Sequence, residues 1–268
     1  MSSKNSSRSW QIVAAAVCSS LTIPISWLCL SYFTGNLIGP ESRSSAYDSL
    51  GQNLLQAEVN VDPETINWEG FDINGKKYIY FGPFPALLRI VLNYIAPQHF
   101  GNWARVSCLM ATTLFIFAST LLVVRIAGSK FSSRGRGFIF VVSLIAGSAF
   151  AFASPVAFLL SSGRIYHEAL LWGLCGAQWS ILFIVLLLEE TSKPNAALFG
   201  LSCAAAVALL SRVTLGLPAY GSLLILLIAV LLQGRRSSCY VAILSILPAA
   251  AALLFQGWYN LERFGGVY

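Results

Sequence analysis

A histidine and a glutamate stand side by side at the head of an apolar segment, in the stretch "RIYHEALL" that runs from Arg164 to Leu171. Nearly every residue from Ala169 to Leu188 is apolar. Carboxylate and imidazole groups together suit a divalent cation such as Mn²⁺ or Mg²⁺, or they hold a substrate through hydrogen bonds. Two ordinary explanations compete with these roles. The helix dipole favours a glutamate in the first turn, and histidine is common at a membrane interface.

Other polar residues with suitable chemistry stand at the ends of apolar segments. Arg164 and Arg212 each carry a guanidinium group, which matches phosphate oxygens bidentately. Tyr166 lies next to the His-Glu pair, and Asn260 lies in the stretch "WYNLERFGGVY", between Tyr259 and Arg263. We therefore expect Tyr166, His167, Glu168 and these three residues to bind substrate. The alternatives are snorkelling arginines and an ordinary interfacial belt of aromatic residues.

The composition predicts the environment of these residues. Of the 268 residues, 56% are hydrophobic and 10% are charged, which is too apolar for an ordinary water-soluble core. The chain is therefore predicted to be an integral membrane protein. Its formal charge is +6, but the basic residues flank apolar segments singly or in pairs. That distribution argues against a nucleic-acid partner and favours contact with lipid headgroups.

Apolar segments long enough to cross a membrane are the main architectural signal. A hydrocarbon core about 30 Å thick requires roughly 17 to 25 helical residues. Seven segments qualify: 10–33, 106–127, 138–161, 169–188, 196–213, 217–233 and 238–258. A further segment, Pro83 to Ala96, is short, opens with two prolines and contains Arg89 and Asn93. We expect this segment to lie on the interface or dip into it. The predicted fold is an all-α polytopic membrane protein with about seven transmembrane helices.

The distribution of charge predicts the orientation of these spans. With the N-terminus in the cytoplasm, the inner side receives nine basic residues and two acidic ones; the basic residues are Lys4, Arg8, Arg125, Lys130, Arg134, Arg136, Lys193, Arg235 and Arg236. This arrangement follows the positive-inside rule. The outer side collects the other nine acidic residues: Glu41, Asp48, Glu58, Asp62, Glu64, Glu69, Asp72, Glu168 and Glu262. The sequence therefore predicts that the chemistry takes place at the outer face.

The first outer loop, residues 35–105, is long for a connection and is expected to be functional. Its segment Ser44 to Leu55 has apolar residues at helical spacing, which predicts a helix at the membrane surface. The segment Phe71 to Phe81 contains Asn74-Gly75 between extended stretches, which predicts a β-hairpin. Gly82-Pro83-Phe84-Pro85 should end the second strand before the interfacial helix.

Taken in order, the motifs "NGKKYIYFGPFPALL", "GRIYHEALLWGL" and "YNLERFG" resemble bacterial membrane proteins of the GT-C glycosyltransferase superfamily, which includes the protein O-mannosyltransferases. The resemblance covers most of the chain. It implies a single module, 1–268, in the bacterial plasma membrane. It also implies transfer of a sugar from a polyprenyl-phosphate-linked donor to an acceptor at the extracytoplasmic face. Relatives continue with further spans or an outer domain, so the resemblance predicts that a C-terminal part is lacking here.

The resemblance assigns the catalytic role to Asp48, because family members place a catalytic carboxylate early in the first outer loop. A carboxylate there takes the acceptor proton as the anomeric carbon is attacked. Protein O-mannosyltransferases have Asp-Glu at this place, whereas Ser49 follows Asp48 here. The competing interpretation is an exposed helix carboxylate without a catalytic role.

The resemblance also places "RIYHEA" in the second outer loop, where relatives often carry acidic or metal-binding residues. A divalent cation held by His167 and Glu168, with Asp48 completing the shell, would neutralise the departing donor phosphate. Some superfamily members act without a metal, and His167 and Glu168 would then position the sugar or phosphate by hydrogen bonds.

Two alternative functions remain open from the sequence. One is a transporter or lipid flippase, a class that typically has internal repeats and ionisable residues at mid-membrane. Pro155 and Pro248 interrupt predicted spans, but no repeat is evident and the charges stand at the ends of the spans. The other is a noncatalytic or truncated GT-C relative.

Overall fold

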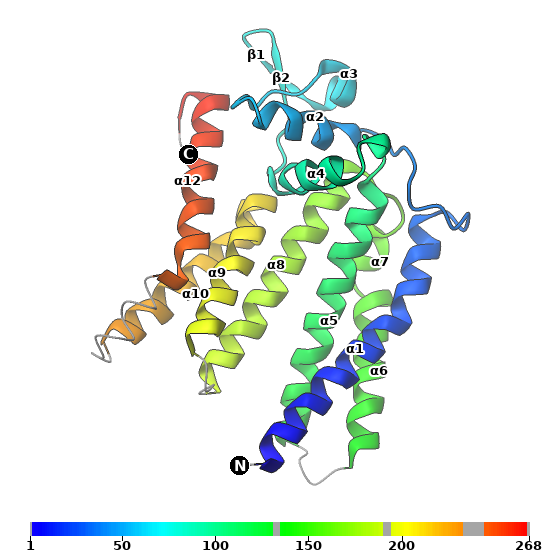
Figure 1. The fold of residues 1–268 in the computed structure, drawn as a ribbon, viewed down its shortest axis with the longest axis vertical. Coiled ribbons are helices and arrows are strands. Elements are labelled where there is room, and N and C mark those ends of the chain that lie inside the picture. Colours follow the sequence, from blue (N-terminus) through cyan, green and yellow to red (C-terminus); the bar gives the residue numbers. More distant parts are fainter. Residues whose placement is uncertain (1, 131–134, 190–193, 233–243, 267–268) are drawn as a thin grey trace.

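The computed structural model describes residues 2–130, 135–189, 194–232 and 244–266, and most of them are helical. Three helices contain a stretch long and apolar enough to cross a membrane: Trp10–Leu30 in α1 (Ser2–Leu30), Ala104–Gly128 in α5 (Ala104–Lys130), and α8 (Ile165–Leu188). These helices run side by side between the end that holds the N-terminus and the end that holds residues 35–105 (Figure 1). The all-α fold with helices able to span a membrane is therefore confirmed.

Four further helices complete the bundle: α6 (Arg136–Phe152), α9 (Pro194–Ser211) and α10 (Val213–Leu232), which have shorter apolar stretches, and α12 (Leu247–Phe264). They correspond to four of the predicted spans, and the total of seven spans stays a prediction. Three of the predicted cytoplasmic loops fall at least partly outside the described residues, including Arg134, Glu190, Lys193, Arg235 and Arg236, as does the start of the segment 238–258.

The segment expected to form one helix over 138–161 is divided in two. Helix α6 ends at Phe152, and the short helix α7 (Pro155–Leu159) follows. The Ser154 hydroxyl oxygen accepts a hydrogen bond from the Val156 backbone N–H and caps α7. Proline lacks a backbone N–H and disfavours helical geometry in the residue before it. Pro155 therefore starts a new helix instead of continuing α6.

Helix α8 lies at the centre of the bundle. It packs along α9 and α5, while α5 also packs against α1 and α6, and α9 also packs against α10 and α12. The approach of α8 to α9 is close, because a Cβ atom on Gly176 would lie 2.6 Å from the Ala208 backbone nitrogen. Small residues allow this kind of contact between membrane helices. The head of α8, which carries His167 and Glu168, is thereby fixed in position.

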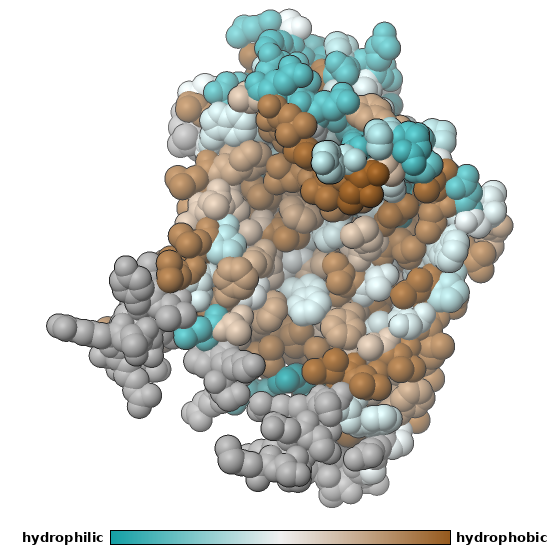
Figure 2. Space-filling view, viewed as in Figure 1, coloured by the Kyte–Doolittle hydropathy of each residue, from teal (hydrophilic) through white to brown (hydrophobic). Residues whose placement is uncertain are grey.

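The long loop forms a hydrophilic cap on one end of the bundle (Figure 2). Its elements are α2 (Ser45–Leu54), α3 (Pro63–Ile66), η1 (Asn67–Glu69), β1 (Phe71–Ile73), β2 (Lys76–Tyr78), α4 (Phe84–Ile95) and η2 (Pro97–His99). The predicted hairpin is confirmed: β1 and β2 are antiparallel with Phe71 opposite Tyr78. Asn74 and Gly75 both have positive φ, 52° and 79°, as a tight two-residue hairpin turn requires.

The helices α2 and α4 pack on each other across the ends of the spans, and α4 contacts α8 and α9 (Figure 1). The apolar face of α2 was expected to contact the membrane surface, but Ala46, Tyr47 and Leu50 are fully buried against the protein. The reason is that α4 and the hairpin cover this face with apolar side chains of their own. The cap therefore shares one apolar core with the ends of α8 and α12, and this core holds α2 over the head of α8.

Candidate functional site

A buried arginine joins the two carboxylates that the sequence singled out. Asp48 on α2, Arg89 on α4 and Glu168 on α8 all have side chains with 0% exposure. Arg89 Nη2 donates to Glu168 Oε2 at 2.7 Å, and Arg89 Nε lies 3.4 Å from Asp48 Oδ2. We call these three residues the carboxylate–arginine triad. The structure thus brings Asp48 and Glu168 together, and it rules out an exposed position for Asp48.

The amide of Asn93 supports the triad from α4. Asn93 Nδ2 donates to Asp48 Oδ1 at 2.8 Å, and Asn93 Oδ1 accepts from Trp103 Nε1 at 2.8 Å. Arg89 and Asn93 are four residues apart, so they lie on one face of α4. Sequence reasoning noted both residues only as polar interruptions of a short apolar helix. Their shared face was the signal that could have identified them as partners of buried carboxylates.

The triad contains two acidic side chains and one basic side chain. One guanidinium serves two carboxylates, and Asp48 Oδ2, Glu168 Oε1 and Arg89 Nη1 have no hydrogen-bond partner among the described residues. Burial raises the pKa of Asp48, while Arg89 and the Asn93 amide act in the opposite direction and do not cancel the effect. Because a buried unpaired charge is costly, Asp48 has an increased tendency to hold a proton.

His167 is adjacent to Glu168 in sequence but faces a different environment. Its Nδ1 lies 2.9 Å from the Ser162 carbonyl oxygen, and its ring packs against Phe158 and Tyr166. A carbonyl oxygen can only accept, so Nδ1 carries the hydrogen, and Nε2 has no partner among the described residues. The described part of the chain has no group of three or more His, Cys, Asp or Glu residues that could hold a metal ion. The metal site at His167 and Glu168 stays a prediction.

A polar cavity of ≈ 370 Å³ lies at the same end of the bundle, between the start of α10, the end of α12 and the segment after β2. We call it the arginine cavity. It is lined by Tyr80, Phe81, Gly82, Ser211, Arg212, Val213, Thr214, Gln256, Asn260, Arg263 and Phe264. Two of the sequence candidates, Arg212 and Asn260, therefore share one cavity.

The arginine cavity carries positive charge, and only some of its polar atoms have hydrogen-bond partners among the described residues. Arg263 donates to the Ile79 carbonyl oxygen and to Asn260 Oδ1, both at 2.8 Å. Arg212 Nε and Gln256 Oε1 are buried without a hydrogen-bond partner in the described part of the chain. No Asp or Glu in that part forms an ion pair with Arg212 or Arg263. Two guanidinium groups without a carboxylate are suited to an anion such as phosphate.

Arg164 and Tyr166 lie apart from the arginine cavity. Arg164 stands at the N-cap of α8, and its Nη1 donates to the Tyr166 hydroxyl at 3.1 Å in an exposed position. Neither residue lines the arginine cavity. The structure therefore divides the sequence candidates among the triad, the cavity and this exposed pair.

Tyr47 connects the triad with the arginine cavity. It follows Ala46 on α2, directly before Asp48, and its buried ring belongs to one apolar cluster with Phe81, Ile165 and Tyr259. Its hydroxyl donates to the Ile165 carbonyl oxygen at 3.4 Å. The charges of Glu168, Arg89 and Arg212 all act on this phenol, and burial raises its pKa well above the usual value. The carboxylates and the cationic cavity are thus two sides of one packed region.

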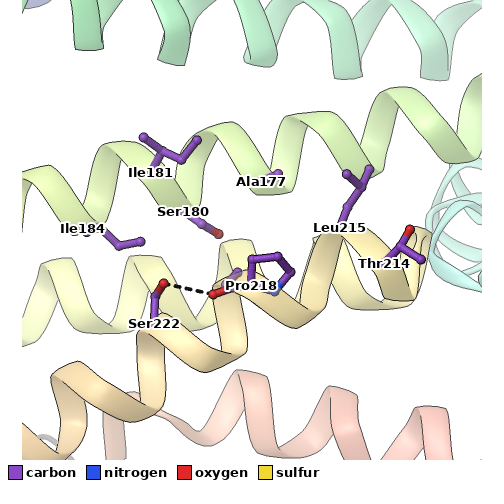
Figure 3. Close-up of a pocket in the computed structure, with 9 residues that line it drawn as sticks. Ala177, Ser180, Ile181, Ile184, Thr214, Leu215, Pro218 and Ser222 are labelled. Atoms are coloured by element: carbon purple, nitrogen blue, oxygen red, sulfur yellow. Dashed lines mark hydrogen bonds between the residues drawn. The ribbon is translucent and has the colours of Figure 1, made fainter.

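Apolar grooves adjoin the arginine cavity on the membrane side. One of ≈ 430 Å³ lies between α10 and α12, and its lining includes Leu217, Gly221, Ala250 and Leu253. A second, of ≈ 190 Å³, lies between α8 and α10, and its lining includes Ala177, Ser180, Ile181 and Ile184 from α8 and Leu215 and Pro218 from α10 (Figure 3). Thr214 lines both this second groove and the arginine cavity. The positively charged arginine cavity therefore continues into the apolar surface of the two grooves.

Comparisons of the chain with protein-family models, with curated proteins and with solved structures return no match.

Proposed function

We propose that the chain is an integral membrane glycosyltransferase that moves a sugar from a polyprenyl-phosphate-linked donor to an acceptor at the extracytoplasmic face of a bacterial plasma membrane. The observation that carries the proposal is the arginine cavity, in which Arg212 and Arg263 converge without a carboxylate partner among the described residues. Bidentate guanidinium groups are the usual protein partners of a phosphate.

The grooves beside the cavity support a lipid-linked donor over a soluble one. Leu217 on α10 is one turn beyond Val213, and Leu253 on α12 is about one turn before Gln256, so the apolar groove begins where the arginine cavity ends. A polyprenyl phosphate likewise has a charged end followed by an apolar chain. Its phosphate would contact the guanidinium groups while its chain lies against Leu217 and Leu253.

The triad would supply the base, which is the remaining group that the reaction needs. In the proposed reaction the acceptor hydroxyl gives its proton to Asp48, its oxygen bonds to the anomeric carbon, and the bond from that carbon to the phosphate oxygen breaks. The electron pair stays on the polyprenyl phosphate, next to Arg212 and Arg263. Asp48 is enclosed by Arg89 and Asn93, so this step requires the acceptor hydroxyl to displace the Asn93 amide from Asp48 Oδ1.

The enclosure of Asp48 also favours one alternative, a noncatalytic GT-C relative that binds a lipid phosphate without turnover. The deciding experiment incubates the purified protein in lipid with labelled polyprenyl-phosphate sugars and measures both binding and transfer, with and without a chelator. Transfer supports the transferase, and chelator sensitivity that is lost in His167→Ala would support the predicted metal. Binding without transfer supports the noncatalytic relative. The absence of both contradicts the proposed function.

A further inference from the structure

A third groove, of ≈ 470 Å³, lies between the surface helices α2 and α4. It is lined by Gly51, Gln52, Leu55, Ile90, Val91, Asn93 and Tyr94. The two helices approach closely behind it, because a Cβ atom on Gly51 would lie 2.9 Å from the Ala86 carbonyl oxygen. The proposed transfer reaction gives this groove no role so far.

The outer part of the groove is apolar and exposed. Leu55, Val91 and Tyr94 are 70%, 54% and 90% exposed. Apolar side chains continue from the spans to the base of the cap (Figure 2). The groove is therefore continuous with the lipid-facing surface of the bundle, and its natural occupant is a molecule of the adjacent leaflet and not a soluble one.

The inner part of the groove is polar and reaches the triad. Asn93 lines the groove and donates from Nδ2 to Asp48 Oδ1 at 2.8 Å. A primary amide has two N–H donors, and the recorded bonds of Asn93 use one N–H and the carbonyl oxygen. Gln52 adds a second amide at the exposed rim of the groove. These groups can bind a hydroxyl, which both donates and accepts.

We propose that the groove between α2 and α4 binds a hydroxyl-bearing amphiphile from the outer leaflet, with its hydrocarbon chain against Leu55 and Val91 and its hydroxyl at Asn93. This inference rests on the proposed function, and it makes the acceptor a lipid-anchored alcohol. The hydroxyl proton passes to Asp48 and the hydroxyl oxygen bonds to the anomeric carbon. The bond from that carbon to the donor phosphate breaks, and the phosphate keeps the electron pair.

The test is photolabelling of the full chain in phosphatidylcholine vesicles with a long-chain alcohol that carries a diazirine in its chain. A probe of equal length with a methyl ether in place of the hydroxyl is the matched comparison. We expect the alcohol to label residues of α2 and α4 about 2- to 10-fold more strongly, the worth of one hydrogen bond. Equal labelling by the two probes indicates general lipid contact and overturns the inference.

Two substitutions on α4 localise the labelling. Val91→Trp fills the groove and should reduce labelling by the alcohol, whereas Ile95→Trp should leave it unchanged, because Ile95 is 71% exposed on the same helix and does not line the groove. Equal effects of the two variants contradict the inference. Photolabelling needs no turnover, so hydroxyl-selective labelling without transfer would contradict the proposed function alone. Transfer to a water-soluble alcohol with no preference for the long-chain one would contradict this inference alone.

Discussion

Arg89 Nη2 lies 2.7 Å from Glu168 Oε2 in a region where both side chains are fully buried. This ion pair ties the surface helix α4 to the head of α8, across 79 residues of chain. The same guanidinium lies beside Asp48 on α2. One side chain therefore fixes the relative positions of the three elements that carry the triad.

Replacing Arg89 should destabilise the cap strongly. Arg89→Met leaves two buried carboxylates without a counter-ion, and removing one partner of a buried pair typically costs about 3 to 5 kcal/mol. Thermal unfolding of the detergent-solubilised protein measures this. The control is Arg164→Met, an exposed arginine whose recorded bond is to a tyrosine. Addition of Glu168→Gln to Arg89→Met should recover part of the loss, and additive effects of the two substitutions would show that the pair is not coupled.

The raised pKa of Asp48 predicts a pH dependence of stability. Because the folded state binds the proton more tightly than the unfolded state, Asp48 contributes stability at low pH that is lost as pH rises from 3.8 through its raised pKa. Asp48→Asn should flatten this part of the curve of unfolding free energy against pH. Asp72→Asn, on the exposed hairpin, is the control and should leave it unchanged. A slope that persists in Asp48→Asn would assign the effect to another group.

Sequence and structure agree best where a local rule determines the conformation. Asn74-Gly75 specifies a tight turn because both residues tolerate positive φ, and the end of α8 at Leu188 follows from a nearly continuous apolar run that stops at Glu189. The break before α7 depends on whether the chain continues past Pro155 or caps at Ser154, and composition does not decide this.

The partners of the candidate residues were harder to predict. Asp48 and Arg89 are joined by packing between α2 and α4, and Arg212 and Arg263 meet because α10 and α12 both pack on α9. These contacts join residues far apart in the chain, and a single sequence contains no local signal for them. The burial of Asp48 was hard to predict for the same reason. The amphipathic spacing of α2 predicted an apolar face, but it did not predict which segments cover that face.

Loss of one guanidinium should weaken lipid-phosphate binding selectively. Arg212→Gln should reduce the affinity for polyprenyl phosphate about 10- to 100-fold, because a hydrogen bond to a charged group is worth about 1.5 to 3 kcal/mol. Affinity for the uncharged polyprenol should be unchanged, since the apolar grooves remain. Arg164→Gln, which lies outside the arginine cavity, is the matched control. Equal losses for both lipids would indicate damage to the fold.

The orientation can be tested with single cysteines in a background without the six native ones. Glu64→Cys lies in the cap, and Gly135→Cys lies at the start of α6, at the opposite end of the bundle (Figure 1). An impermeant maleimide added to intact cells should label the first and not the second. Labelling of Gly135→Cys alone would reverse the orientation, and labelling of both from one side would contradict the spanning bundle.

The proposed mechanism depends most directly on Asp48. The decisive measurement is sugar transfer from a labelled polyprenyl-phosphate sugar by the parent protein and by Asp48→Asn, in the same lipid and at matched amounts of folded protein. If Asp48 is the base, the parent transfers the sugar and Asp48→Asn is slower by about 10² to 10⁴, the usual worth of a positioned acid or base. Equal rates would remove Asp48 from the mechanism, and a parent that binds the donor without transferring the sugar would contradict the glycosyltransferase itself.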